Sequence, residues 1–569
     1  MAYIAKKTIK GKVYYYFMES KRIQGKPGHS KQIYLGTAEQ VMEKLSLVTG
    51  AQPPVHSKDL ELGSVAAFFH LSKKLGIVEM MDRISGKRNQ GLSMGHYLLA
   101  AIINRAVSPV SKRGLEEWYD NTMLREWMPV ASGMLKSQRF WDNVSRWEDD
   151  KINAFESEFL KRIVLEYDIH PKCLIYDATN FFTFIDTENE KADLAKRGHC
   201  KSKRNDLRIV GLSLMFSRED EIPLFYETYC GNTNDSKQFA CAIKNLKEKY
   251  RKVFHEEADI TIIFDRGNNS LANIKSLSES EVSFRYVGGL KKNQCKDLYE
   301  VGSCCYEPAS RKELSGLTYY RTQMEVYGKL HTIIVTDNPA LEKGQLQGIE
   351  KRISNCLKQI RELEERLEKR RTGELKGGKR PTIESICKNM EKILKAEYMK
   401  RLFVYDVKEG EDKLPVLEYH YSITELEWLK EHDLGKTVLF TDHADWESEE
   451  IILAYRSAWK IEHTFRQMKD TEYLTVRPLY CWTDQKIKAH IFCCVMAVRL
   501  CYLLKKELAS HGIETGINEM LESLGKKKQY IHYYQQKRGM RESYSVSMPG
   551  EKTEMIMEAL GLKQYEKRS

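Results

Sequence analysis

Two short apolar segments that each end in an aspartate place the strongest constraint on how this chain folds. Residues 173–176 precede Asp177, and residues 260–264 precede Asp265. A short apolar run of this kind is typical of a buried strand, so we expect each aspartate at the end of a strand. A third acid, Glu462, lies almost two hundred residues further on, inside a helical pattern. If the three side chains meet, they form an all-oxygen site of the kind that hard divalent cations prefer.

The pattern around Glu462 indicates why an acid stands there. One stripe of the expected helix is apolar, formed by Ile451, Ala454, Ala458, Ile461, Phe465 and Met468. The neighbouring stripe contains Ile452, Tyr455, Trp459, Glu462, Arg466 and Lys469. Glu462 is therefore expected at the edge of a buried face, where a carboxylate needs a partner. That partner is either a divalent cation or Arg466, since an i,i+4 ion pair is worth roughly a few tenths of a kcal/mol; the helix alone does not decide.

Length and charge limit the class of protein. A chain of 569 residues is too long for one hydrophobic core, so we expect three or four domains. The net charge of +11 is a moderate basic excess, but the first fifty residues hold nine Lys and Arg against three acids, and Lys201–Arg204 and Lys526–Lys528 are further basic clusters. Such clusters can attract phosphate independently of sequence.

Targeting signals and cysteine usage favour an intracellular protein. The N-terminus shows no apolar run of the signal-peptide type, and the thirteen cysteines form no CxxC pair. The apolar stretch 489–504 carries His490 and Arg499 and is too short to span a bilayer, so a buried helix is expected. We therefore expect a cytoplasmic, nucleoid-associated protein with reduced thiols and no membrane contact.

The first two regions are predicted to be a β module and a helical domain. Residues 1–50 contain strand-like segments at 12–18 and 32–35, with tyrosines between lysines. That composition has two equally favoured interpretations: a β module that contacts DNA, or an ordinary β-hairpin whose lysines are solvated. Residues 55–167 show helical periodicity, including one helix from Ser137 to Leu160.

The next region, residues 168–290, is predicted to form the first part of a mixed sheet. Its apolar segments are residues 173–177, 207–216, 222–229 and 260–265, with a helix from 235 to about 254 between the last two. The order β-β-β-α-β opens a ribonuclease H-like fold, in which the strands ending in Asp177 and Asp265 lie side by side.

An insertion is then expected over residues 291–437. It begins with two strands around a turn at Gly328, and continues with apolar residues spaced alternately three and four apart from Leu346 to Leu367. With a second helix after a Gly- and Lys-rich loop, residues 345–400 are predicted to form an antiparallel coiled-coil hairpin. The sequence does not decide whether this hairpin contacts a partner or DNA, or is only a spacer that packs on itself. The sheet core resumes over 438–510, and 511–569 is expected to be a tail that contacts DNA or a second subunit.

Three blocks of the sequence resemble the signature blocks of DDE transposases of bacterial insertion sequences. They are Tyr176-Asp177-Ala178-Thr179, Asp265-Arg266-Gly267-Asn268, and Tyr455, Glu462 and Lys469 at intervals of seven residues. The resemblance is to the cut-and-paste branch, which has a long insertion before the catalytic glutamate. One residue differs from the pattern of that branch: Ala458 stands four residues before Glu462, where the branch has an arginine that contacts phosphate. Arg456 and Arg466 are the candidates to replace it.

The resemblance implies an α/β (α+β multidomain) protein with a ribonuclease H-like core and a two-metal mechanism. Asp177, Asp265 and Glu462 would be the catalytic residues and would hold two Mg²⁺ or Mn²⁺ ions for phosphodiester cleavage and strand transfer. The implied DNA contacts are Tyr455, Arg456, Trp459, Arg466, Lys469 and Arg266. Either Trp428 or Trp446 would stack on a flipped base. The implied partners are double-stranded DNA, as terminal inverted repeats and target, and a second copy in a synaptic homodimer.

Two other functions fit the same sequence. A decayed transposase could act as a DNA-binding repressor without chemistry, although all three acids are present. A structure-specific nuclease on the same core would cut without joining, and the long insertion disfavours it. Zinc is disfavoured because His199, Cys200 and His463 form no four-ligand pattern. A phosphatase is disfavoured because Thr179 stands where its second aspartate would be.

Overall fold

Both apolar segments form strands of one large mixed sheet, which confirms the predicted mixed α/β class. Asp265 directly follows its strand as predicted. The prediction that Asp177 ends its strand is wrong, because pairing with the neighbouring antiparallel strand continues as far as Phe182. The computed structural model describes residues 2–9, 11–23, 26–42, 54–86, 91–186, 188–254, 260–278, 284–375, 377–535 and 539–568. The predicted boundary at residue 50 lies outside this set. The chain divides into two units, the first comprising Met1–His70, Glu117–Val130 and Glu507–Ser569, and the second Leu71–Glu116 and Ala131–Lys506.

The core of the large sheet has the strand order β8-β7-β5-β9-β10. These strands are β5 (Cys173–Phe182), β7 (Arg208–Ser217), β8 (Pro223–Cys230), β9 (Thr261–Phe264) and β10 (Arg285–Gly289). β5, β9 and β10 run parallel, and β7 is antiparallel to both β5 and β8. Helices α9 (Asp235–Phe254) and α10 (Leu271–Ser278) make the crossovers. This order is consistent with a ribonuclease H-like core.

The same sheet continues through the strand at which the predicted core resumes and then through two strands that the sequence assigns to the insertion. β16 (Lys436–Thr441) pairs with both β10 and β13 (Lys329–Asp337), and β12 (Thr318–Val326) follows β13. Val287 on β10 and Thr332 on β13 both lie opposite Thr441. The hairpin at Gly328 therefore extends the core sheet rather than forming a separate layer. The short elements β6 (Lys196–Arg197) and β11 (Glu307–Pro308) complete it.

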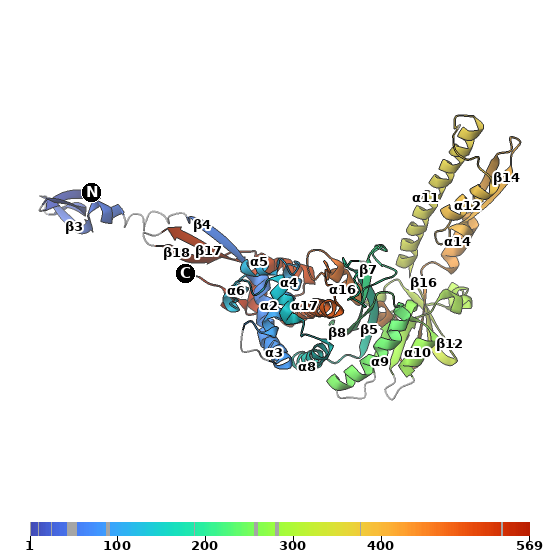
Figure 1. Cartoon of the computed structure of the whole chain (residues 1–569), viewed down its shortest axis with the longest axis horizontal. Coiled ribbons are helices and arrows are strands. Elements are labelled where there is room, and N and C mark those ends of the chain that lie inside the picture. The colour runs from blue at the N-terminus through green and yellow to red at the C-terminus, as the bar shows by residue number, and fades with distance from the viewer. Residues whose placement is uncertain are drawn as a thin grey trace. The chain divides into compact units, whose positions relative to one another are not determined.

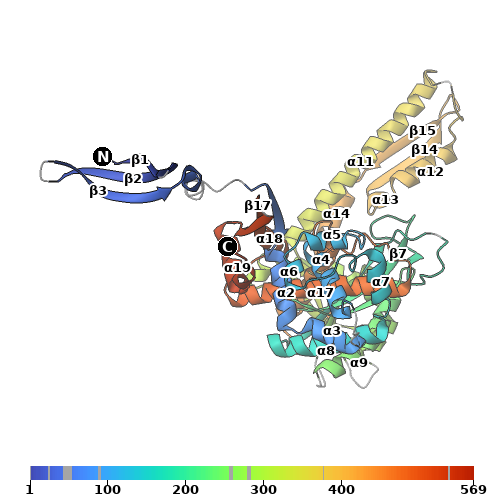
Figure 2. The same ribbon diagram turned by 60° about the vertical axis from the view of Figure 1, so that its left-hand side comes forward.

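The rest of the insertion forms an arm built on one long helix, α11 (Pro339–Arg371) (Figures 1 and 2). The predicted heptad residues, from Ile349 to Leu367, are buried in its core. The second helix, α12 (Ile383–Ile393), has only 11 residues against 33 in α11, so it cannot cover the whole apolar stripe. The hairpin of β14 (Phe403–Glu409) and β15 (Pro415–Tyr421) packs against the same cluster. The arm is thus a helix covered by a short helix and a β-hairpin, not the predicted helical hairpin alone.

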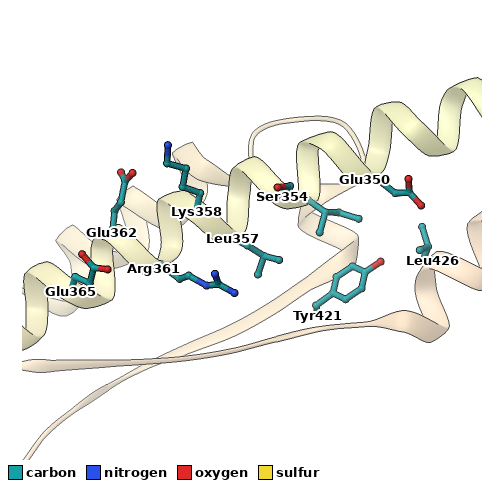
Figure 3. A pocket seen from close by; sticks show the side chains of 10 residues that line it. Glu350, Ser354, Leu357, Lys358, Arg361, Glu362, Glu365, Tyr421 and Leu426 are labelled. Carbon is teal, nitrogen blue, oxygen red and sulfur yellow. The ribbon is translucent and has the colours of Figure 1, made fainter.

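The arm carries a surface groove of about 720 Å³ between α11 and β15 (Figure 3). Leu357, Tyr421 and Leu426 line it together with charged side chains such as Glu350 and Arg361. The remaining elements of the arm are α13 (Met399–Leu402) and α14 (Ile423–His432). None of the predicted catalytic residues lines this groove.

Helices α15 (Ser448–Arg456) and α16 (Trp459–Lys469) replace the single helix that the sequence predicts around Glu462. The break falls at Ser457 and Ala458, where the Ser457 hydroxyl donates to the carbonyl of Ala454 and competes with the regular helix pattern. As a result, Glu462 lies in the first turn of α16. The helix dipole favours a carboxylate there.

The helical part of the second unit includes α3 (Ile77–Ser85), α4 (Met94–Val107), α7 (Ser137–Val144) and α8 (Asp149–Tyr167). The predicted helix from Ser137 to Leu160 is wrong, because it breaks between α7 and α8. Trp147 in the break is fully buried against Phe155 and Phe492. Asp149 and Asp150 then begin α8, where acids are favoured.

The predicted buried helix at 489–504 lies within α17 (Asp484–Ser510). Among the described residues, α17 alone is long and apolar enough to cross a membrane, but 94% of its most apolar window is buried inside the protein. Arg499 in this window donates to the Glu156 carboxylate at 2.7 Å and to the carbonyls of Pro223 and Leu224. A buried arginine with these partners indicates a core helix.

The first unit contains two three-stranded antiparallel sheets. β1 (Ala2–Ile9), β2 (Lys12–Ile23) and β3 (Lys26–Gly36) form one, and β4 (His56–Glu61), β17 (Lys528–Gln535) and β18 (Met540–Val546) form the other. In the first sheet, Tyr16 lies 5.3 Å from Tyr34 and the Lys7 ammonium lies over Tyr16. The predicted strands at 12–18 and 32–35 are confirmed, and their DNA contact stays a prediction.

The segment 511–569, expected as a tail, is largely folded. α18 (Ile517–Gly525) and α19 (Glu551–Ala559) flank β17 and β18, and Ile531 packs with Leu60 and Leu62 from the start of the chain. Lys527, expected in a basic cluster, is buried and pairs with Glu554 and Glu566. It therefore serves the core of this unit. The unit also holds α6 (Leu124–Trp127), while α2 (Gly63–Lys74) and α5 (Leu115–Asp120) cross from one unit into the other.

Candidate active site

The register of β5 against β9 brings the two aspartates side by side. Tyr176 on β5 pairs in parallel with Phe264, the last residue of β9. Asp177 and Asp265 directly follow this pair, so they occupy equivalent positions on neighbouring strands. Asp177 is half-buried and Asp265 is exposed. Asp265 lies at the carboxyl end of its strand, the usual place for a binding site in such sheets, whereas Asp177 lies within β5 opposite Leu214 of β7.

Electrostatics shows that Glu462 lies near Asp177. Burial raises the pKa of Asp177 to about 6, and the charges of Asp265 and Glu462 raise it further, while Lys201 and the backbone N–H of Ala178 act in the opposite direction. The Ala178 N–H donates to the Asp177 carboxylate at 2.7 Å. The charges of Asp265 and Glu462 therefore both act on Asp177, although Glu462 itself is exposed.

Two alternatives for Glu462 can now be compared. Within the described ranges, no ion pair joins Glu462 to Arg466, so the plain i,i+4 salt bridge is not formed. The same residues also hold no group of three or more His, Cys, Asp or Glu side chains arranged to bind a metal ion. The carboxylates thus interact electrostatically without forming a closed ligand set, and the metal role of these three residues stays a prediction.

Tyr455 holds Asp265 in place. Its hydroxyl donates to the Asp265 carboxylate at 3.1 Å, and the backbone of Arg266 forms a hydrogen bond with the same hydroxyl. Burial, followed by the charge of Asp265, raises the pKa of Tyr455, so the phenol stays a donor. Gly289 on β10 makes room for this contact, because a Cβ there would lie 2.7 Å from the Tyr455 hydroxyl oxygen. Tyr455, predicted as a DNA contact, here binds a catalytic candidate.

Three cations gather on the other side of Asp177. The Lys469 ammonium donates to the Thr179 hydroxyl, two residues after Asp177. Lys201 donates to the Ala178 carbonyl, and Arg477 donates to the Ser202 hydroxyl at 3.3 Å. Burial lowers the pKa of Lys469, and the neighbouring charges of Lys201 and Arg477 lower it further. Like charges held this close favour an anion beside the acids.

The other predicted DNA contacts are accessible. Arg456, Trp459, Arg466 and Arg266 are exposed, with 60% of the Trp459 side chain open to solvent. Trp459 lies at the start of α16, one turn before Glu462. Trp459 and Arg466 lie on the same helix as Glu462. The role of all four side chains in DNA contact stays a prediction.

Neither tryptophan proposed to stack on a base is distinguished by its surroundings. Trp428 stacks on His432 at 4.6 Å and receives the Arg401 guanidinium at 4.0 Å. Trp446 stacks on His443 at 3.9 Å. Both rings already have a partner on one face, so the choice between them stays open.

Sequence reasoning missed Lys201, Arg477 and Gly289. Lys201 belongs to the basic cluster 201–204, and Arg477 begins the block that follows α16. The sequence therefore shows that both residues are basic, but not that they lie near Asp177. Gly289 follows Gly288 at the end of an apolar strand, and only the approach of Tyr455 explains why it has no side chain.

Comparison with known families identifies the class of protein to which this site belongs. A family model described as "Transposase DDE domain" matches residues 170–500, which include all three acids and more than half of the chain. The chain belongs to this family. The prediction of a DDE transposase, and with it DNA transposition as the process, is therefore confirmed at the level of the family.

Individual relatives add little. The cryo-EM structure of a piggyBac transposase synaptic complex with hairpin DNA is similar with a TM-score of 0.36 and 9% identity, covering 83% of this chain and 82% of that one. The kinesin heavy chain of Doryteuthis pealeii is 24% identical over 257 residues, or 42% of this chain. The match spans 25% of the kinesin. Neither likeness carries an argument about this site.

The raised pKa of Asp177 predicts a stability effect with a definite sign. Because the folded-state pKa of about 6 exceeds the ordinary 3.8, ionisation of Asp177 costs stability as pH rises through this range. Asp177→Asn should therefore raise the free energy of unfolding by about 1–3 kcal/mol at about pH 7.5 without divalent ions, and by much less at about pH 4.5. Urea denaturation at both pH values measures the difference.

The matched control for that experiment is Asp193→Asn. Lys196 lowers the pKa of the exposed Asp193 carboxyl, so neutralising this residue should give no stabilisation at either pH. A wild type that is as stable as Asp177→Asn at about pH 7.5 would show that Asp177 carries no electrostatic penalty.

The contact between Gly289 and Tyr455 predicts a coupled pair of substitutions. Gly289→Ala should push the Tyr455 hydroxyl off Asp265 and destabilise the protein by about 1–3 kcal/mol. In the Tyr455→Phe background the same change should cost less, because the close hydroxyl oxygen is gone. A double-mutant cycle by urea denaturation measures the coupling, with Gly302→Ala, whose Cβ would meet only Cys304 Sγ at 3.6 Å, as the neutral control. Strict additivity would contradict the packing argument.

Proposed function

We propose that this chain is a transposase of a bacterial insertion sequence that cleaves DNA at the ends of its element and joins them to a target. The observation that carries the proposal is the pairing of Tyr176 with Phe264, which aligns Asp177 and Asp265 on neighbouring parallel strands within charge range of Glu462. The family match over residues 170–500 supports the reaction class. The assignment to bacterial insertion sequences rests on the three sequence blocks.

The three acids suit divalent cations because their donor atoms are oxygens. Asp177, Asp265 and Glu462 offer only oxygen ligands, and their mutual repulsion, which raises the pKa of Asp177, would be relieved by a cation between them. These three residues would hold two Mg²⁺ or Mn²⁺ ions. When bound, such ions activate the attacking oxygen and stabilise the leaving oxygen of an in-line phosphoryl displacement.

The surrounding residues prepare the acids and attract the substrate. Tyr455 fixes the orientation of one Asp265 oxygen through its 3.1 Å hydrogen bond. Lys469, Lys201 and Arg477 present positive charge beside Asp177, where a DNA phosphate would lie against the sheet. Such preorganised cations stabilise negative charge without reorganising during the reaction.

The exposed face of α16 would extend the DNA contact. Trp459 offers a large open ring at the start of the helix, and Arg466 continues the same face one turn beyond Glu462. Arg456 and Arg266 are exposed as well and would contact the backbone of double-stranded DNA. Synapsis of two element ends calls for a homodimer on DNA, and the reaction would take place in the cytoplasm at the nucleoid.

Cleavage of terminal-repeat DNA tests the proposal. The purified full chain with Mg²⁺ or Mn²⁺ should cut the repeat end and join it to a target plasmid, and Asp177→Asn should abolish both reactions while leaving DNA binding intact. Gel analysis of labelled ends measures cutting and joining. Asp186→Asn, which changes an exposed acid outside the site, is the matched control.

The outcomes separate the three functions. Cutting without joining would indicate a nuclease, and binding without cutting by the wild type would indicate a repressor. Cleavage that persists in Asp177→Asn would exclude the assigned site.

The cation cluster predicts a change in salt dependence. If Lys469 and Arg477 each contact one phosphate, Lys469→Gln and Arg477→Gln should each reduce the slope of log affinity against log salt by about 0.9. Fluorescence anisotropy with repeat DNA over a salt series measures the slope. Lys191→Gln, an exposed lysine elsewhere in the same unit, should leave it unchanged. An unaltered slope in both cluster variants would remove these residues from the DNA contact.

A further inference from the structure

A cavity of about 340 Å³ lies at the base of the arm, next to the catalytic acids. Its walls come from two parts of the second unit: Arg266, Tyr299 and Lys436 from the core, and Gly344, Gly348 and Tyr398 from the arm. Arg266 directly follows Asp265 in the chain, so the cavity and the candidate active site share one loop.

The cavity holds more positive than negative charge. Four cations line it, and two of them are paired: Lys292 with Asp433 at 2.5 Å, and Arg352 with Glu397 at 3.5 Å. Across the part of the chain that the structure describes, Arg266 and Lys436 form no ion pair with a carboxylate. The cavity therefore has two cations in excess of its acids.

Arg266 and Lys436 both act within the cavity. Burial raises the pKa of Tyr299 and of Tyr398 to about 12, and the charge of Arg266, which lines the same cavity, opposes the rise at both phenols. Lys436 donates to the Tyr299 carbonyl at 2.9 Å. Burial lowers the pKa of Lys436, the carboxylates of Asp337, Glu431 and Asp433 act in the opposite direction, and the charge of Lys292 lowers it further. Cations held together in a partly buried space favour an anion.

Two glycines keep the cavity open. Gly344 and Gly348 lie one turn apart on α11, and a Cβ at either position would meet no atom within 4 Å. Glycine is less favourable inside a helix than any residue except proline, so two glycines in one turn weaken α11. Alanine would stabilise the helix at no steric cost, and the glycines instead leave its backbone bare toward the cavity.

We propose that this cavity binds a phosphate group through Arg266 and Lys436, with the phenols of Tyr299 and Tyr398 beside it. A guanidinium and an ammonium that line one small polar cavity suit the oxygens of a phosphate. The group is carried by a DNA strand that leaves the catalytic acids or by a free phosphate compound. The DNA source rests on the proposed function, whereas phosphate binding itself does not.

The first experiment uses inorganic phosphate as the probe. Phosphate added to the full chain at constant ionic strength should raise its melting temperature in a saturable way, since a ligand that binds only the folded state stabilises it. Gly348→Leu should melt at or above the wild type, because leucine favours the helix, yet should lose the phosphate response by filling the cavity. Asn355→Leu, an exposed position on the same helix, should keep the full response. Lys436→Met should raise the phosphate concentration needed for half of the maximal response by about tenfold.

The second experiment identifies the source of the phosphate. Anisotropy with repeat DNA should show about tenfold weaker binding by Gly348→Leu if a DNA strand enters the cavity. Unchanged DNA binding together with a lost phosphate response would support a free phosphate compound. A wild type without a saturable phosphate response, or a Gly348→Leu variant that keeps it, would overturn the proposal. Because these readouts do not involve cleavage, an inactive wild type would count against the proposed function and not against this site.

Discussion

The parallel pairing of β5 with β9 is the interaction on which the candidate site depends. In an antiparallel pair the residues after Tyr176 and Phe264 would run in opposite directions, whereas parallel strands in this register carry Asp177 and Asp265 side by side. The crossover through α9 makes the parallel pairing possible. Everything else at the site is arranged around that fixed pair: Tyr455 from one side, Lys469 and Lys201 from the other, and Glu462 from the start of α16.

The protein holds this arrangement against its own electrostatics. A half-buried Asp177 with two further acids nearby is unfavourable, and its raised pKa records that cost. Lys201 and the Ala178 N–H offset part of it, but they do not neutralise the acids. Strain of this kind is expected at a functional site, where a structure optimised only for stability would place a neutral residue. Lys201 and Arg477 likewise repel Lys469, and the charge of Asp177 and the pairing of Lys201 with Asp235 offset this repulsion in part.

The sequence predicted the parts of the fold that depend on local patterns. Apolar runs before Asp177 and Asp265 identified the strands, and the spacing from Leu346 to Leu367 identified α11, because both patterns follow directly from burial of one face. It did not predict the break at Ser457, where one side-chain hydrogen bond decides between a continuous helix and two. It also did not predict that a β-hairpin would cover α11, since an apolar stripe does not specify the element that packs on it.

The site residues divide in the same manner. The three acids lie in patterned segments and were identifiable, whereas Lys201, Arg477 and Gly289 matter only through tertiary approach, which no local pattern records. Pairing between β4 and β17 joins residues more than four hundred positions apart, and only then does the buried Lys527 belong to a core rather than to a basic surface. Charge clusters in a sequence therefore indicate composition, while burial decides which of their members can meet a ligand.

The loop at 265–266 connects the catalytic acids to the arm. Asp265 accepts a hydrogen bond from Tyr455, the Arg266 backbone bonds the same hydroxyl, and the Arg266 side chain lies near the phenols at the base of the arm. Two adjacent residues of opposite charge thus face two neighbouring spaces, and Tyr455 bonds the side chain of one and the backbone of the other. A ligand in the cavity would hold Arg266, and through the shared hydroxyl it would also hold the Asp265 carboxylate. The physical link between arm and acids is therefore short: one peptide unit and one phenol.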